Sequence, residues 1–268
     1  RPLYALGAEV QVAGRHLFDW DNTLEEFRRA LRDGADAAVF THVSNVFGYI
    51  LPVEEMAALC REQGVPFILD AAQSAGILPV KLNALGAEFI AAPGHKGLLG
   101  PQGTGLLLCR GEAAPLLFGG TGSESIRKDM PDMLPERLEA GTVNVPGAAG
   151  LDAGMRYVLS QGSRIGAAEH RQTRRCARML EKLGVQAFYG AHQAGTISFV
   201  PGEDCEVFAQ RLADRGIAVR AGLHCAPLAH RTAGTLESGT IRISPSVFNT
   251  EGQINLFLRE MREILREN

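Results

Sequence analysis

The chain has 268 residues, of which 46% are hydrophobic and 21% charged, and its formal net charge is −3. This composition is typical of a globular protein, and the small negative charge gives no reason to expect a nucleic acid or an anionic membrane as partner. No apolar run has the length of a transmembrane helix, and no signal-peptide pattern opens the sequence.

Strands alternate with helices through the first half of the chain. The predicted elements are strands at 3–12, 37–40, 65–69, 89–92 and 104–109, with helices at 24–31 and 52–63. Such alternation predicts an α/β fold with a mostly parallel sheet.

The second half begins after two segments without regular pattern, a flexible loop at 119–125 and a punctuated stretch at 138–146. The elements predicted there are helices at 148–159, 165–183, 205–215 and 250–266, with strands at 195–200, 217–220 and 240–244. We therefore predict a large domain over 1–146 and a smaller C-terminal α/β domain over 147–268.

The stretch from Ile68 to Gly103 carries the strongest chemical signal. An apolar strand ends in a lone acid, Asp70, and a Gly-His-Lys triplet at 94–96 follows among glycines. A carboxylate at the end of a buried strand is typical of an α/β ligand site. A lysine in a glycine-walled pocket is a candidate Schiff-base amine. Together they indicate pyridoxal 5′-phosphate (PLP), which needs a lysine for its aldehyde and a charged partner for its pyridine nitrogen.

Four ordered motifs carry a family resemblance. They are D-A-A-Q-S-A-G at 70–76, G-H-K at 94–96, E-A-G-T-V-N at 139–144 and R-A-G-L-H-C-A-P-L at 220–228. The whole chain resembles the cysteine desulfurases of the class V aminotransferase superfamily. The resemblance implies PLP fold type I: a large PLP-binding domain at 1–146, incomplete at its N-terminus, and a small C-terminal domain at 147–268.

The resemblance also implies the cofactor contacts. Lys96 would bind the aldehyde, and Asp70 would pair with the protonated pyridine nitrogen. Gln73 would donate to the phenolic oxygen, which Asn45 would also approach together with the substrate. His95 would contact the phosphate.

Two further features concern the phosphate. Pro93 stands where many relatives have Ser or Thr, and it offers neither a hydroxyl nor an N–H. Thr142 resembles the residue that reaches the phosphate of the neighbouring subunit's cofactor, which implies a homodimer with a shared site.

The sulfur chemistry depends on Cys225. It lies in a glycine-containing loop beside His224 and near Arg220, and positive neighbours raise the thiolate fraction of a cysteine. Arg242 matches the residue that clamps the substrate carboxylate, with Arg220 as a second substrate-binding candidate. The implied activity converts L-cysteine to L-alanine, forms a persulfide on Cys225 and passes the sulfur to an acceptor, for which a protein is a candidate.

The remaining cysteines and the histidines have plainer interpretations. The other four cysteines are expected to be small buried apolar residues, and they are Cys60, Cys109, Cys176 and Cys205. An odd count without a C-x-x-C pair disfavours disulfides and zinc, so we expect a reducing cytoplasm. The spacing of His42, His224 and His230 fits no metal site well.

Alternatives remain at this stage. Lys96 could be a surface lysine, Asp70 a helix cap and Asn45 a turn residue, while Arg242 could form a surface ion pair. Another class V PLP enzyme would use the same fold, namely an aminotransferase, an epimerase or a β-lyase. Cys225 discriminates against these three, because only the persulfide mechanism needs that thiol. Selenocysteine lyase activity is a further alternative, which the motifs leave open.

The chain starts at Arg1 in mid-pattern, so we expect that an N-terminal part of the native protein is absent. The resemblance implies that this part carries a Gly/Thr phosphate-binding turn and the residue that stacks on the pyridine ring. We therefore expect the 268-residue chain to bind PLP poorly by itself, and an inactive fragment or a sulfur-carrier scaffold is a further alternative.

Overall fold

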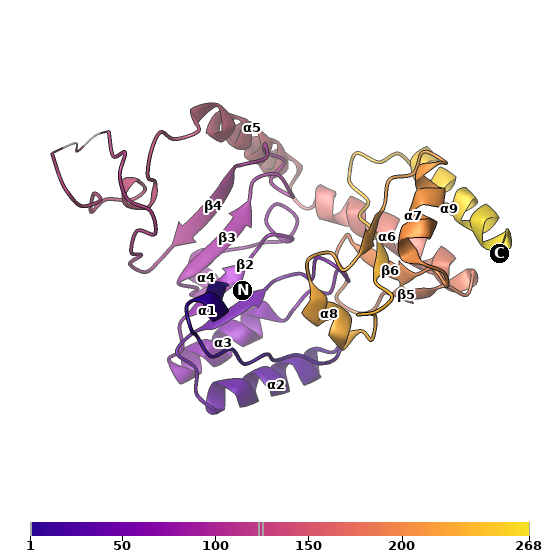
Figure 1. The fold of residues 1–268 in the computed structure, drawn as a ribbon, viewed down its shortest axis with the longest axis horizontal. Helices are drawn as coiled ribbons and strands as arrows, with labels where there is room; N and C mark the ends of the chain where they lie inside the picture. Colours follow the sequence, from indigo (N-terminus) through magenta and orange to yellow (C-terminus); the bar gives the residue numbers. More distant parts are fainter. Residues whose placement is uncertain (1, 123, 125, 268) are drawn as a thin grey trace.

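The computed structural model describes residues 2–122, 124 and 126–267, which form two bodies with a sheet each (Figure 1). The helices and 3₁₀ turn of this part are α1 (Pro2–Ala5), α2 (Trp20–Arg32), α3 (Val53–Gln63), α4 (Leu82–Leu85), η1 (Glu136–Leu138), α5 (Val145–Gln161), α6 (Arg164–Lys182), α7 (Cys205–Ala213), α8 (Pro227–Thr232) and α9 (Glu251–Arg266). The strands are β1 (Ala38–Thr41), β2 (Phe67–Asp70), β3 (Phe89–Pro93), β4 (Gly105–Cys109), β5 (Gln186–Phe188), β6 (Ile197–Val200), β7 (Arg220–Gly222) and β8 (Thr240–Ile243).

The first sheet has the strand order β1-β2-β3-β4. Strands β1 to β3 are parallel, with α3 and α4 in the crossovers, while β4 returns antiparallel to β3. The mostly parallel sheet predicted from the sequence is therefore confirmed. Because parallel strands end at the same edge, Asp70 at the end of β2 and the lysine loop after β3 are brought to one edge.

One face of this sheet is packed and the other is open. Helices α2 and α3 lie along the packed face, where Phe40, Leu69 and Ile90 are buried (Figure 1). On the opposite face Val39 and Leu107 are exposed. Successive residues of a strand point to opposite faces, so this alternation follows from the strand register.

The second body holds an antiparallel sheet in the order β5-β6-β8-β7. Helices α6, α7 and α9 contribute to its core, in which Leu180, Phe199, Phe208 and Met261 are fully buried. Each body has its own hydrophobic cluster, which supports two domains. The boundary at 146/147 stays a prediction, and Leu151 of α5 packs beside Gly94 and Gly100 of the first body.

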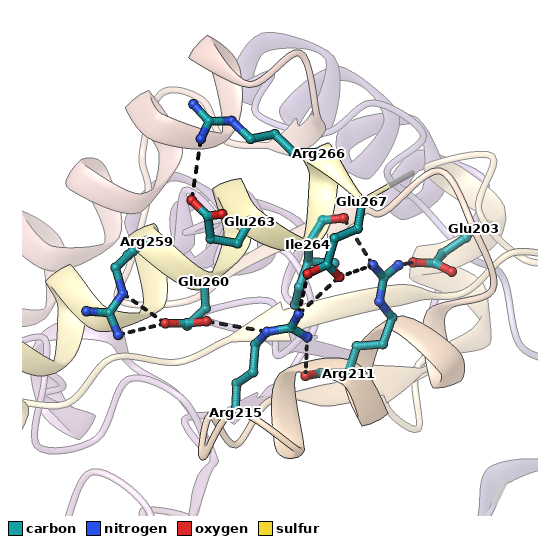
Figure 2. A network of polar contacts seen from close by, with 9 residues as sticks. All are labelled: Glu203, Arg211, Arg215, Arg259, Glu260, Glu263, Ile264, Arg266 and Glu267. Atoms are coloured by element: carbon teal, nitrogen blue, oxygen red, sulfur yellow. Dashed lines mark hydrogen bonds and ion pairs between the residues drawn. The ribbon is translucent and has the colours of Figure 1, made fainter.

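An arginine–glutamate network holds the end of α9 against α7 (Figure 2). Arg211 Nη2 lies 2.9 Å from Glu267 Oε2 and donates to the Ile264 carbonyl at 3.1 Å. Arg215 reaches Glu267 at 2.8 Å and Glu260 at 3.4 Å. The C-terminal helix is therefore joined to its neighbour by ion pairs at the rim of an apolar contact.

Three groups of sequence predictions differ from the structure. The strand predicted at 3–12 is wrong: α1 occupies Pro2–Ala5, and no sheet pairing follows it within the described residues up to β1. The strand predicted at 217–220 pairs only from Arg220 onward. The short elements β5, α4 and α8 were not predicted, because elements of three to six residues are too short to show a period.

In the described part of the chain, the structure contains no helix with the length and apolar composition needed to span a bilayer. Residues 123 and 125 of the predicted loop at 119–125 lie outside the described residues.

Candidate active site

Lys96 lies in the tight loop that joins β3 to β4. Backbone hydrogen bonds shape this loop: Gly94 N–H donates to the Thr104 carbonyl at 2.8 Å, and Gly100 N–H donates to the Gly94 carbonyl at 2.7 Å. The Leu99 N–H donates to the Lys96 carbonyl at 2.9 Å. Lys96 itself is exposed, and it lines the hollow described below.

The loop that follows Asp70 packs directly on the lysine loop. A Cβ at Gly76 would collide with the Gly97 carbonyl, and a Cβ at Gly97 would collide with the Ala75 carbonyl. Gly76 also has a φ of +83°, which favours glycine. The motifs at 70–76 and 94–96, separate in the sequence, therefore form one continuous surface.

A hollow of about 310 Å³ lies beside this surface, and it gathers three predicted site residues: Lys96, Gln73 and Arg242. Its walls include the segment from Ser244 to Val247, which follows β8. The hollow thus combines an amine, an amide and a guanidinium from both bodies.

Arg242 is a half-buried cation without a carboxylate partner among the described residues. Its Nη1 donates to the Asn45 carbonyl at 2.9 Å, but its Nε is buried and has no hydrogen-bond acceptor in the described part. Burial, together with the charge of Arg220, lowers the pKa of Arg242. A partly desolvated guanidinium with an unused donor has the chemistry to accept an anion.

Asp70 and the hollow do not coincide. Asp70 is exposed and lines a second, apolar hollow of about 690 Å³ with Ala91 and Pro93. Its Oδ1 accepts a hydrogen bond from Ala72 N–H at 2.8 Å, which makes a local turn. His95 and Thr142 are also exposed, and neither lines either hollow.

Asn45 does not line the hollow but joins the two bodies. Its Nδ2 donates to the His224 carbonyl at 2.7 Å, across 179 residues of sequence. Its own carbonyl accepts from Arg242. Asn45 therefore contacts both the arginine of the hollow and the loop that carries Cys225.

Cys225 lies outside the hollow, in the loop between β7 and α8. It is exposed, and the Nη2 of Arg220 lies 3.7 Å from its Sγ. Two other cysteines are inert by comparison, since burial raises the pKa of Cys60 and of Cys176 to about 11.

The expectation that His224 is a positive neighbour of Cys225 is wrong. Burial, and then the charge of Arg242, lower the pKa of His224 to about 4, so its imidazole is neutral at pH 7. Of the two predicted positive neighbours of Cys225, His224 and Arg220, only Arg220 carries a charge near the thiol at pH 7.

Glu169 of α6 is a residue of the hollow that the sequence interpretation missed. Burial raises its pKa to about 7, and the Val247 N–H, which donates to it, acts in the opposite direction. A Cβ on Gly195 would lie 2.8 Å from Glu169 Oε2, so Gly195 makes room for the carboxyl group. The spacing of Glu169 along α6 could have identified it from the sequence. It lies four residues after Ile165 and four before Thr173, both buried, and residues four apart share one face of a helix.

The histidines do not form a metal centre in the described part of the chain, where no group of three or more His, Cys, Asp and Glu side chains is arranged around a common point. The rings of His224 and His230 lie 5.7 Å apart. Burial lowers the pKa of His42 to about 4.

Comparisons of the sequence and of the fold with known proteins give consistent results. The sequence profile of the family described as Aminotransferase class-V matches residues 4–257. A probable cysteine desulfurase of Pyrococcus abyssi is 36% identical over 247 residues, which are 87% of this chain and 60% of that protein. A cysteine desulfurase of Synechococcus elongatus is 35% identical over 90% of this chain and 40% of its own length.

Among solved structures, the apo cysteine desulfurase of Thermococcus onnurineus is 35% identical and superposes with a TM-score of 0.84. That match covers 99% of this chain and 68% of the other. The chain thus spans 60% or less of the length of the two curated relatives named above.

Proposed function

This chain belongs to the class V aminotransferase family, whose members depend on PLP, and we propose that it acts as a PLP-dependent cysteine desulfurase. The observation that carries the proposal is the hollow in which Lys96, Gln73 and the guanidinium of Arg242 meet, the last with an Nε that has no acceptor among the described residues. The names of the relatives support the same reaction.

The donor set fits PLP and an amino acid. Lys96 supplies an amine in a glycine-containing loop, and Gln73, which lines the same hollow, supplies an amide donor. The unused Nε of Arg242 suits a carboxylate. Asp70 would serve the pyridine nitrogen, and His95 and Asn45 are the further cofactor contacts of the proposal.

In this reaction Arg242 binds and orients the carboxylate of L-cysteine, and Arg220 is a second candidate for that contact. PLP, when bound, supplies an electron sink for the electrons of the bonds broken next to the substrate amine. The Lys96 amine takes the proton from the substrate Cα.

The Cys225 thiolate then attacks the substrate sulfur. A sulfur–sulfur bond forms as the Cβ–S bond of the substrate breaks. The electron pair of the Cβ–S bond remains with the substrate carbon, which is protonated to give L-alanine. Cys225 keeps the sulfur as a persulfide for transfer to an acceptor, for which a protein is part of the proposal.

The proposal includes a homodimer in which Thr142 reaches the neighbouring site. Four apolar side chains between β4 and η1 support it, since Leu116, Leu117, Phe118 and Ile126 are 91%, 68%, 71% and 99% exposed. Figure 1 shows this segment reaching away from the first sheet. A cytoplasmic location is also proposed, and the five unpaired cysteines support it.

The deciding experiment replaces the thiol. We expect Cys225→Ser in the native protein, with saturating PLP, to keep the cofactor and to stop the release of alanine and sulfur from L-cysteine. Alanine and sulfide are measured in parallel with PLP absorbance, and Cys109→Ser, a half-buried cysteine of β4, is the matched control. Turnover of Cys225→Ser at the parent rate would contradict the persulfide mechanism and favour another class V reaction.

A further inference from the structure

The loop that carries Cys225 has an unusual backbone. His224 and Cys225 are consecutive non-glycine residues with φ values of 49° and 62°. Residues with a Cβ rarely adopt this left-handed region, and two in succession persist only where the surroundings hold them. The contacts around these two residues therefore determine the direction in which the thiol points.

One anchor lies within the second body. The His224 ring is buried, and its Nε2 lies 3.1 Å from the Thr240 carbonyl and 3.2 Å from Thr240 Oγ1. Because a carbonyl can only accept, Nε2 carries the proton and donates to it. Thr240 is fully buried in β8, so the ring is attached to a rigid strand.

The other anchor comes from the first body. Asn45 follows β1 and donates through Nδ2 to the His224 carbonyl at 2.7 Å, while its own carbonyl accepts from Arg242 at 2.9 Å. The Cys225 loop is thus connected through one residue to the arginine of the hollow.

We propose that Asn45 and His224 are positioning residues for the Cys225 thiol, and that Asn45 couples the position of this loop to Arg242 and the first body. The chemical use of the thiol rests on the proposed desulfurase function. The anchoring itself requires neither cofactor nor turnover, so it is measured independently.

The experiment follows the loop directly. Hydrogen–deuterium exchange reports the Ala226 amide, which donates to the Leu223 carbonyl at 2.9 Å and closes the turn. Iodoacetamide labelling with peptide mapping reports Cys225, and fully buried Cys176 in the same sample reports global unfolding. The variants are Asn45→Asp, Asn45→Ala and His224→Asn, and Asn83→Asp on the exposed surface of α4 is the matched control.

We expect each of the three variants to exchange the Ala226 amide about tenfold faster and to change the labelling rate of Cys225, because one hydrogen bond of the loop is lost. Asparagine tolerates a positive φ but is too short to reach Thr240. His224→Asn therefore removes the hydrogen bond to Thr240 while the backbone conformation stays accessible. Asn83→Asp is expected to match the parent.

Parent rates in the Asn45 and His224 variants would overturn the proposal. Labelling of Cys176 in all three would also overturn it, because the residues would then support the whole fold and not the loop. If Cys225→Ser left turnover unchanged, the desulfurase proposal would fail while the exchange results still decided the anchoring.

Discussion

At the residue scale, Glu169 shows how burial alters a titration. Its pKa is raised from 4.5 to about 7, so between these values the folded chain holds a proton that the unfolded chain releases. The free energy of unfolding contributed by this group therefore falls as pH rises from 4.5 to about 7 and is constant above.

We expect Glu169→Gln to remove this fall of the unfolding free energy with pH, because glutamine does not titrate. Glutamine also keeps an acceptor for the Val247 N–H. The stability of the variant relative to the parent should rise by at most about 1.4 kcal/mol per pH unit across that window. Urea unfolding at several pH values measures it. His42 and His224, whose pKa values are near 4, make the unfolding free energy rise with pH. They do so equally in parent and variant, so their contributions cancel when the two proteins are compared. A difference independent of pH would contradict the assignment.

Lys96 is the second residue whose role has a direct chemical readout. We expect borohydride reduction of the protein with PLP to attach the cofactor to Lys96, because only this lysine lines the hollow among the residues the structure describes. Peptide mapping locates the adduct, and Lys96→Ala should abolish both the adduct and the turnover. Lys81→Ala is the control, and a main adduct on Lys81, Lys128 or Lys182 would disprove the assignment.

At the element scale, the contact between two glycine loops determines the site. A Cβ on Gly97 would meet the Ala75 carbonyl and lie 3.0 Å from Ile77 Cγ1. The hydrogen bond from the Gly100 N–H to the Gly94 carbonyl helps to shape the lysine loop, and a Cβ on Gly97 would force one of the two loops to shift. We expect Gly97→Ala to cost about 1–3 kcal/mol in unfolding free energy and to weaken PLP binding.

The matched control for that substitution is Gly252→Ala in α9. Gly252 lies in the first turn of α9, where a Cβ makes only an ordinary contact with Thr250, and because alanine has the higher helix propensity we expect a gain of at most about 0.5–1 kcal/mol in unfolding free energy. The two substitutions should therefore shift the urea midpoint in opposite directions. Equal midpoints for Gly97→Ala and the parent would mean that the loops are not closely packed.

At the scale of the whole molecule, the exposure of the site residues predicts weak cofactor binding. Lys96, Asp70 and His95 are all exposed, and Asp70 lines a different hollow from Lys96. We expect the 268-residue chain to bind PLP poorly, because exposed contacts compete with water. Titration with PLP, followed by absorbance, measures the affinity. The same titration of Lys96→Ala gives the signal from PLP bound to other lysines, which is subtracted. Tight stoichiometric binding would show that the exposed arrangement is sufficient.

Sequence by itself determined the existence of α2, β1, α3, β2, β3 and β4, because side-chain period and turn chemistry are local properties. Helix α3, for example, follows Pro52 and ends at Gln63, where Gly64 caps it with a φ of 66°. The same local motifs singled out Lys96, Gln73 and Arg242, which the fold brings to one hollow.

Only the tertiary structure decided what depends on distant partners. The segment at 3–12 has strand-like alternation but no neighbouring strand to pair with in the described chain, so it is not a strand. Burial makes His224 neutral and raises the pKa of Glu169, and the bond from Asn45 to His224 joins residues 179 positions apart. A local pattern carries the period of a segment, whereas desolvation and long-range hydrogen bonds arise from what packs against it.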